Sequence, residues 1–179
     1  MQQSIQLVRG RDNQIVEATL LSLAPKHLDD FDNLWLQQLL LYRQEDKYWD
    51  WVLKKRMSLN NENYESYAIE YEERTQGLMW IETQWHRSQV EVERRIVYVE
   101  ALATAPWNRR TIQQPPELKG VGTLLLNFAR RRSLDLGYEG RISLHALPEA
   151  QRFYDSRNMM NFGPDPDKED LIYFEYGRI

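Results

Sequence analysis

Apolar and polar positions alternate in some parts of the chain and recur at helical spacing in others. From 15 to 23 they alternate, which predicts a strand that ends at Pro25. From 28 to about 59, apolar side chains return every three or four residues, which predicts helices. The polar stretch 43–46 separates two such helices, and the asparagine-rich stretch 60–63 is expected to form a turn.

Three strands are predicted next, over about 66–72, 77–84 and 95–104, because these segments are rich in β-branched and aromatic residues. Polar links join them, which indicates an antiparallel meander. Pro106, Pro115 and Pro116 then interrupt the pattern.

A helix is expected to begin at Gly120, because apolar residues from Val121 to Ala129 fall on one face. Gly137 is placed to end it as a left-handed cap. A strand over 142–147, a helix from Pro148 to about 158 and a strand over 171–176 follow. This order predicts a mixed, mostly antiparallel sheet flanked by helices, of the α/β or α+β class. The strand-helix-strand unit over 95–147 is expected to be a right-handed crossover.

The composition is typical of a globular chain. Apolar residues make up 42% of the 179 residues and charged residues 28%. The length predicts a single domain over 1–179. No apolar run approaches the roughly eighteen residues of a membrane-spanning helix, and the first residues lack the pattern of a secretion signal. We therefore expect a cytoplasmic protein with no membrane partner, either a monomer or a homodimer.

The absence of cysteine excludes disulfides, thiolate metal sites and cysteine nucleophiles. His27 and His86 are isolated, so we interpret both as surface residues and expect no metal site. A net charge of −4 argues against sequence-independent binding of nucleic acid and is compatible with cationic amines as substrates. Basic residues gather between 109 and 132, where an anion is expected to bind.

The strongest local signal is Pro116-Glu117-Leu118-Lys119-Gly120-Val121-Gly122-Thr123, between a strand and an amphipathic helix. Glycines there let a phosphate approach the backbone, and the N–H groups and dipole of a helix start attract anions. Two glycines before a helix are also common in ordinary turns. The third glycine of a dinucleotide fingerprint is absent, because that position is Leu125, and no P-loop lysine follows.

This segment resembles the phosphate motif of the GNAT superfamily of acyl-CoA-dependent N-acyltransferases, Gln/Arg-x-x-Gly-x-Gly/Ala. Glu117 departs from its first position, and Lys119 is a compensating cation. The stretch Ala150-Gln151-Arg152-Phe153-Tyr154-Asp155-Ser156-Arg157-Asn158-Met159 is similar to the family's Ala-x-x-Phe-Tyr-x-x-x-Gly-Phe, and Leu147 departs where many members have asparagine. The element order over 15–176 is also that of the family. The resemblance therefore covers most of the chain and implies a GNAT-type fold.

The resemblance implies that acetyl-CoA or another acyl-CoA binds as co-substrate. In this interpretation Tyr154 protonates the departing thiolate, a role that suits a hydroxyl with an ordinary pKa of about 10. The resemblance also implies that the pantetheine arm follows the backbone of Leu102, Ala103 and Thr104. The pyrophosphate is expected to bind at Lys119, Gly120, Val121, Gly122 and Thr123.

The general base is left open between several groups. Glu100 is a carboxylate in the apolar strand 96–102, where a charge is costly unless it is paired or faces a cleft. Glu82 competes with it from the preceding strand, and a salt bridge with an arginine is the alternative for either. His145 lies on the strand that parts from 95–104 in this family. It is either a base or water relay, or a structural histidine.

The resemblance implies direct transfer of an acyl group, with acetyl favoured, to an amine of a small molecule, a peptide or a protein lysine. The alternative is a noncatalytic acyl-CoA-binding sensor or assembly domain of the same fold. The aromatic-rich region 35–51 is expected to form core and a wall of the acceptor site. Arginines 130–132 are expected to lie on a solvated surface.

Overall fold

The computed structural model describes all residues from 1 to 179. Its strands are β1 (Gln2–Arg9), β2 (Ile15–Ser22), β3 (Tyr64–Tyr71), β4 (Arg74–Glu82), β5 (Val97–Thr104), β6 (Leu118–Lys119), β7 (Ile142–Ala146), β8 (Met160–Asp165) and β9 (Leu171–Tyr176). Its α-helices are α1 (Pro25–Asp30), α2 (Leu36–Leu41), α3 (Trp51–Asn60), α4 (Val121–Asp135) and α5 (Gln151–Ser156). None of these helices combines the length and the apolar character needed to cross a bilayer.

The nine strands form one sheet in the order β6-β1-β2-β3-β4-β5-β7-β9-β8. β1 pairs antiparallel with β2 and β6, β2 with β3, and β9 with β7 and β8, whereas β5 and β7 are parallel. The predicted mixed, mostly antiparallel sheet flanked by helices is therefore confirmed. Contacts along the chain fall into two compact units, and one domain over 1–179 stays a prediction.

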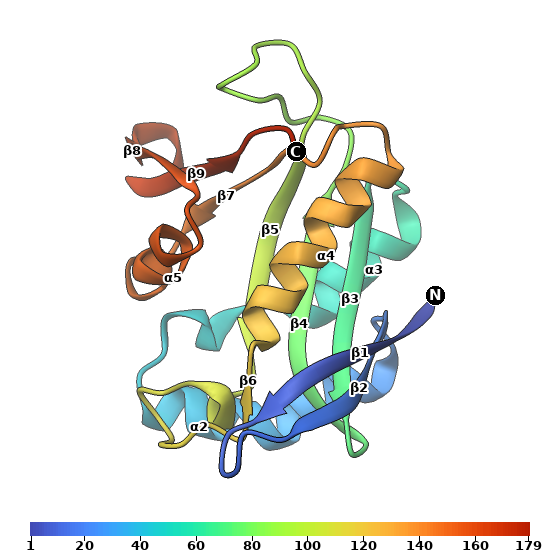
Figure 1. Ribbon diagram of the computed structural model, residues 1–179, viewed down its shortest axis with the longest axis vertical. Coiled ribbons are helices and arrows are strands. Elements are labelled where there is room, and N and C mark those ends of the chain that lie inside the picture. The colour runs from blue at the N-terminus through green and yellow to red at the C-terminus, as the bar shows by residue number, and fades with distance from the viewer. The chain divides into compact units, whose positions relative to one another are not determined.

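One unit contains residues 1–62, 66–80 and 101–125. In it, β1 and β2 form a hairpin, and the end of β1 also pairs with β6 (Figure 1). Ile5 and Leu7 are buried whereas Ser4 and Gln6 are exposed, so one face of β1 enters the core. Trp35 and Leu39, four residues apart, are fully buried, and the Trp35 indole N–H donates to the Thr75 carbonyl at 3.2 Å. The helical spacing of this region therefore reflects a face that packs in the core.

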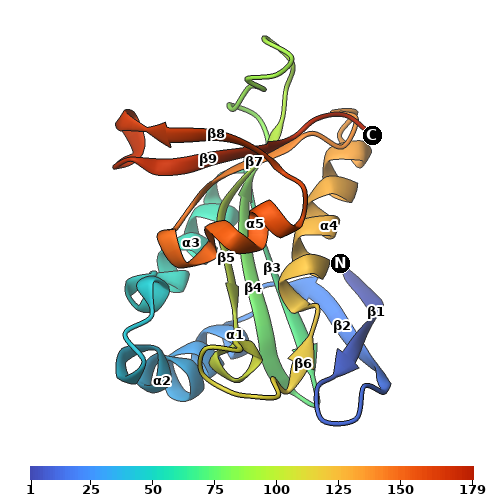
Figure 2. The ribbon, with the colours of Figure 1, turned by 60° about the vertical axis from the view of Figure 1, so that its left-hand side comes forward.

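The other unit contains residues 63–65, 81–100 and 126–179. Its β8–β9 hairpin continues the sheet beyond β7, and α5 connects β7 to β8 (Figure 2). Leu126, Leu144 and Phe174 are among its buried apolar side chains. Gly137 has a φ of +77° and Asn158 a φ of +60°, so both adopt the left-handed conformation expected of helix caps.

β5 and β7 pair over only a short stretch. Val97 pairs with Ile142 and Tyr98 with Ser143, whereas Val99 and Glu100 have no partner residue in β7. Both strands nevertheless continue, β5 to Thr104 and β7 to Ala146. The two strands thus part directly after Tyr98.

The predicted elements agree with the structure to within about three residues, but three strands are missing from the sequence-based prediction. β1 has exposed polar side chains at half of its positions, and β6 has two residues. β8 contains Gly163 and Pro164, residue types that are depleted in strands. The break expected at 43–46 is present, because Arg43 has a φ of +51° just after α2.

Candidate functional site

Gly120 joins β6 to α4 with a φ of +91°, a conformation that glycine adopts without strain. The Leu124 N–H donates to the Gly120 carbonyl at 2.9 Å, so helical hydrogen bonding begins at this residue. The N–H groups of a first helical turn lack partners within the helix, and the helix dipole adds positive potential. Because Gly120 is exposed and Gly122 half-buried, an anion can approach this helix start.

Gly77 of β4 allows the start of α4 to lie close to the sheet. A Cβ at this position would lie 2.7 Å from Cγ1 of Val121 and 3.0 Å from Cδ1 of Leu125. Both of these side chains are buried. The position of the glycine-containing helix start therefore depends on the missing side chain at residue 77.

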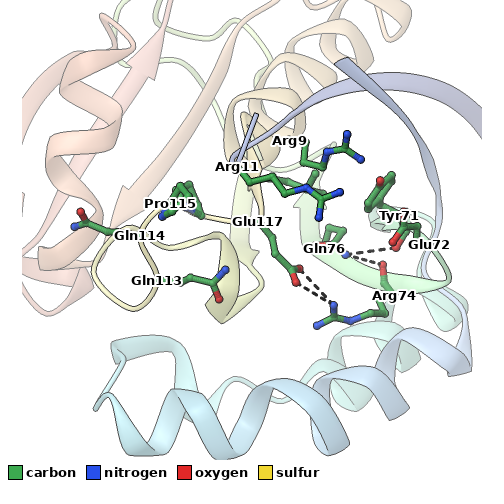
Figure 3. Close-up of a pocket in the computed structure, with 12 residues that line it drawn as sticks. Arg9, Arg11, Tyr71, Glu72, Arg74, Gln76, Gln113, Gln114, Pro115 and Glu117 are labelled. Carbon is green, nitrogen blue, oxygen red and sulfur yellow. Dashed lines mark hydrogen bonds and ion pairs between the residues drawn. The ribbon is translucent and has the colours of Figure 1, made fainter. Parts of the chain in front are cut away.

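Glu117, three residues before Gly120, is compensated by a neighbouring cation. Its carboxylate lies 3.3 Å from the guanidinium of Arg74, which in turn lies over the Trp107 ring at 4.1 Å from the ring centroid. Glu117 and Arg74 line a cavity of about 400 Å³ together with the β1–β2 turn, the β3–β4 turn and 113–118 (Figure 3). The acidic residue at the first motif position thus carries no unbalanced charge toward the helix start.

Several basic residues between 109 and 132 have partners within the protein, and the anion site expected in this stretch stays a prediction. Lys119 Nζ donates to Oδ1 of Asn13 at 2.5 Å. Arg132 forms an ion pair with Glu65 at 2.7 Å, and Arg130 donates to the carbonyls of residues 140 and 177. The expected solvated surface at 130–132 is therefore correct only for the exposed residue 131, because acceptors lie within reach of the other two guanidinium groups.

Arg109 binds the last residue of β5, where pantetheine contacts are predicted. Its Nε–H and one Nη2–H donate to the Thr104 carbonyl at 3.0 and 2.8 Å. The remaining N–H groups donate to Gln44 and to both carboxylate oxygens of Asp46. Residues 102 and 104 are half-buried and residue 103 is buried. The Thr104 carbonyl is thus already occupied, and only other backbone groups of 102–104 remain for a ligand.

Tyr154 lies on α5 with its ring against Phe174 of β9, the ring centroids being 5.6 Å apart. Its side chain is 6% exposed, and its hydroxyl forms no hydrogen bond with another group of the protein. Burial raises the pKa of Tyr154, so the hydroxyl stays protonated. It is therefore a proton donor without a protein acceptor.

His145 of β7 has a partner at each ring nitrogen. Nδ1 lies 2.7 Å from the hydroxyl of Tyr98 on β5, and Nε2 lies 2.9 Å from Oδ2 of Asp165 on β8. Burial lowers the pKa of His145, and the Asp165 carboxylate opposes this effect. Burial and the charge of Glu100 raise the pKa of Tyr98. The structure therefore brings two of the predicted base candidates, His145 and Glu100, to the surroundings of one tyrosine.

Glu82 and Glu100 differ in their surroundings. Glu82 is fully buried and accepts hydrogen bonds from the backbone N–H groups of 84–86 and from the His86 ring, the ring contact being 2.7 Å. Although burial acts to raise the pKa of Glu82, these hydrogen bonds lower it overall. Glu100 is half-buried, two residues beyond Tyr98 and past the point where β5 and β7 part. Glu82 is thus a stabilised structural carboxylate, whereas Glu100 remains a candidate base.

Tyr154 and His145 lie on opposite faces of the sheet. Successive residues of a strand point to opposite faces. On β9, Tyr173 contacts the His145 ring, with centroids 5.1 Å apart, whereas the next residue, Phe174, contacts Tyr154. The candidate proton donor and the candidate base therefore occupy separate sides of the sheet.

The expectation of a surface position is wrong for His27, whereas His86 is partly exposed. His27 is 1% exposed, and its Nδ1 accepts a hydrogen bond from the Ala24 N–H at 2.8 Å at the start of α1. His86 is half-buried, and its ring stacks on Tyr98 with centroids 3.9 Å apart and an interplanar angle of 9°. Residues at helix starts and in turns are usually exposed, which is why the sequence predicts exposed side chains for both histidines.

The two hydrogen-bond partners of His145, Tyr98 and Asp165, are missing from the sequence-based prediction. Tyr98 stands two positions before Glu100, and strand alternation places both on one face, so the pattern contains the signal that identifies it. Asp165 lies on β8, a strand that the sequence does not predict, and no local pattern links it to His145.

No protein-family model matches the sequence, and no curated protein matches it. Solved structures do resemble the fold. An N-acetyltransferase, PaiA, from Thermoplasma acidophilum in complex with coenzyme A is 11% identical over 90% of this chain and 99% of its own, with a TM-score of 0.59. The N-acetyltransferase YlbP of Bacillus subtilis, also with coenzyme A, is 12% identical over 98% and 97%, with a TM-score of 0.53.

A protein of Desulfovibrio desulfuricans, assigned as an acetyltransferase of the GNAT family, is 9% identical over 89% of this chain and 98% of its own, with a TM-score of 0.60. Identities this low establish the fold alone. The sheet order, the helix start at Gly120 and these likenesses agree with each other. The chain has the fold of the GNAT acetyltransferases.

Proposed function

We propose that this chain is an acyl-CoA-dependent N-acyltransferase, with acetyl-CoA as the favoured donor and a primary amine as the acceptor. Solved structures of the same fold include N-acetyltransferases in complex with coenzyme A, which supports this class of reaction. The single observation that carries the proposal is the parting of β5 and β7 directly after Tyr98. Near this parting, the protonated hydroxyl of Tyr154 lies on one face of the sheet, and the His145 ring lies on the other face.

The donor would be held through its phosphates and its carbonyl. The first N–H groups of α4, around Gly120 and Gly122, are suited to the pyrophosphate of coenzyme A. Backbone N–H groups at the end of β5 are suited to the oxygen of the thioester carbonyl, where negative charge develops. Arg109, which holds Thr104, fixes that strand end.

In the reaction, the amine nitrogen attacks the carbonyl carbon, and a C–N bond forms as the carbonyl electron pair moves to oxygen. The tetrahedral intermediate collapses with cleavage of the C–S bond, and Tyr154 protonates the departing thiolate. An alkyl amine with a pKa of about 10 is mostly protonated at neutral pH, so a base is also needed. Glu100 and His145 are the two candidates for it.

The proposal is tested by the thermal stability of the protein with coenzyme A. A ligand that binds only the folded state raises the melting temperature by mass action. Gly122→Glu places a carboxylate and a side chain at the proposed pyrophosphate site and should abolish the shift. The control is Gly177→Ala, where a Cβ meets nothing closer than 3.7 Å. A full shift in folded Gly122→Glu would show that the phosphates bind elsewhere.

A further inference from the structure

Tyr98, His145 and Asp165 form a continuous hydrogen-bonded chain across three strands of the sheet. The Tyr98 hydroxyl is 2.7 Å from Nδ1 of His145, and Nε2 is 2.9 Å from Asp165. Tyr98 is 4% exposed, and the His145 side chain is 8% exposed. These hydrogen bonds therefore lie where β5 and β7 part, in a region from which water is largely excluded.

The ionised state of Asp165 determines which atom donates and which accepts in each of these hydrogen bonds. Hydrogen bonds from the His145 ring and the Asp167 N–H lower the pKa of Asp165, so Asp165 is an ionised carboxylate that can only accept. Nε2 of His145 must then carry the hydrogen. In a neutral ring Nδ1 is consequently an acceptor, and the Tyr98 hydroxyl donates to it.

We propose that Tyr98, His145 and Asp165 are the proton-accepting relay of the acyl transfer, an inference that rests on the proposed function. The attacking amine gives a proton to the Tyr98 oxygen, directly or through one water, while the Tyr98 proton passes to Nδ1 of His145. One N–H bond of the amine and the O–H bond of Tyr98 break, and new O–H and N–H bonds form. The positive charge moves from the amine nitrogen to the imidazole ring, beside Asp165. Solvent later removes the extra proton from the ring.

Neighbouring side chains fix the relay and set its charge. The His86 ring is stacked on Tyr98, and the buried Glu82 holds His86 at 2.7 Å. Lys168, whose ammonium lies 6.0 Å from the centre of the Tyr98 ring, and His86 act with burial to lower the pKa of His145, whereas Asp165 raises it. The titratable Tyr173 also packs against the His145 ring. These groups keep the ring neutral at the start of the reaction and stabilise the cation once a proton arrives.

If these hydrogen bonds only held the strands together, the position of the His145 proton would not matter. Two hydrogen bonds hold β5, β7 and β8 together whichever way their protons point. A relay that accepts a proton at Nδ1 instead requires the Nε2–H tautomer of His145. Asp165 acts only through His145 and is therefore a positioning residue, while Tyr98 is the catalytic group that meets the amine.

The tautomer is measurable without any acyl acceptor. In protein with ¹⁵N-labelled histidine, the nitrogen chemical shifts of His145 should report a neutral ring protonated at Nε2 at pH 7. Asp165→Asn presents an amide that can donate to Nε2, so the ring should switch to the Nδ1–H form and donate to Tyr98. A wild-type ring protonated at Nδ1 overturns the relay, whatever the enzyme does.

Measurements of kcat then distinguish a catalytic relay from hydrogen bonds that only hold the strands together. With an amine that the wild type acylates, Asp165→Asn and Tyr98→Phe should each lower kcat by roughly 10²–10⁴-fold, the range of general base catalysis, with the Kd for coenzyme A unchanged. Asp167→Asn is the matched control, because that exposed carboxylate lies outside the relay. Normal kcat in either folded variant overturns the relay, as does an equal loss of turnover and of coenzyme A affinity.

The two proposals fail in different ways. If the wild type binds coenzyme A but acylates no amine, the proposed function falls, and the relay falls with it as a catalytic device even when the tautomer is as expected. If the wild type turns over and Glu100→Gln alone removes activity, the proposed function stands and the relay is wrong.

Discussion

Arg109 and Asp46 are joined by two hydrogen bonds, of 2.8 Å from Nη1 and 2.6 Å from Nη2. The other three N–H groups of the guanidinium bind Gln44 and the Thr104 carbonyl, so every donor is used. The pair therefore fastens the segment between α2 and α3 to the end of β5. It also places the Arg109 charge where only Asp46 neutralises it.

We expect Asp46→Ala to lower the free energy of unfolding by roughly 3 kcal/mol, because it leaves a mostly buried guanidinium without its counter-charge. Urea denaturation measures this loss. The double variant Asp46→Ala with Arg109→Met should recover part of it. Asp12→Ala is the control, since its ion pair with Arg9 is far more exposed. An equal loss of unfolding free energy in Asp46→Ala and in Asp12→Ala would contradict the proposed importance of Arg109.

Gly77→Ala should displace the start of α4. The new Cβ would lie 2.7 Å from Val121 and 3.0 Å from Leu125, and overpacking of a close-packed region costs about 1–3 kcal/mol. Because Val121 follows Gly120 directly, the affinity for coenzyme A should fall together with stability. Isothermal titration calorimetry on the folded variant measures this affinity. Unaltered binding would separate the helix start from the phosphate site.

Tyr154→Phe should slow acyl transfer by about 10²–10⁴-fold, because it removes the proton donor for the thiolate. Stability should change little, since the hydroxyl has no hydrogen bond to lose within the protein. Tyr176→Phe should show the opposite pattern, because the Tyr176 hydroxyl donates to the Arg157 carbonyl. Rates and urea midpoints of both variants test this. If Tyr154→Phe turns over normally, solvent protonates the thiolate.

The stability of the protein should decrease as the pH falls below about 6.5. Burial lowers the pKa of His27 and of His145 below the ordinary value of about 6.5. Between the folded and unfolded pKa values, the unfolded chain binds more protons at these sites, so the free energy of unfolding rises with pH across that window. The slope is at most about 1.4 kcal/mol per pH unit for each histidine.

Urea denaturation of the wild type and of His27→Gln between pH 5.5 and about 7.5 measures this slope. The variant should have a shallower dependence on pH than the wild type, because one buried neutral ring is gone. The same slope in both proteins would mean that His27 does not titrate differently on folding.

Strong local periodicity made most elements predictable from the sequence. The alternation in β2, the helical spacing through Trp35 and Leu39, and the left-handed caps at Gly137 and Asn158 are local signals, and the structure contains each of them. β1 and β8 lack such signals, because pairing with a neighbouring strand stabilises them more than their own composition does.

The candidate site was predictable only where a role depends on local sequence. The glycine helix start and the helix that carries Tyr154 follow from short segments. The contacts of His145 with Tyr98 and Asp165, and of Arg109 with Asp46, join residues 20 to 63 positions apart. Tertiary packing alone creates such pairs, and it also buries His27. Glu82 and His86 are only four residues apart, but no recognisable motif marks their contact.

The most direct test of the account is acyl transfer itself. The purified protein is incubated with isotopically labelled acetyl-CoA and a panel of primary amines, peptides and lysine-containing proteins, and mass spectrometry follows labelled products while a thiol assay follows free coenzyme A. We predict a labelled N-acetyl product and free coenzyme A in equal amounts, both dependent on the amine and both reduced in Tyr154→Phe. Acetyl-CoA that is bound yet remains intact with every acceptor would contradict the account and identify the chain as a noncatalytic acyl-CoA-binding protein.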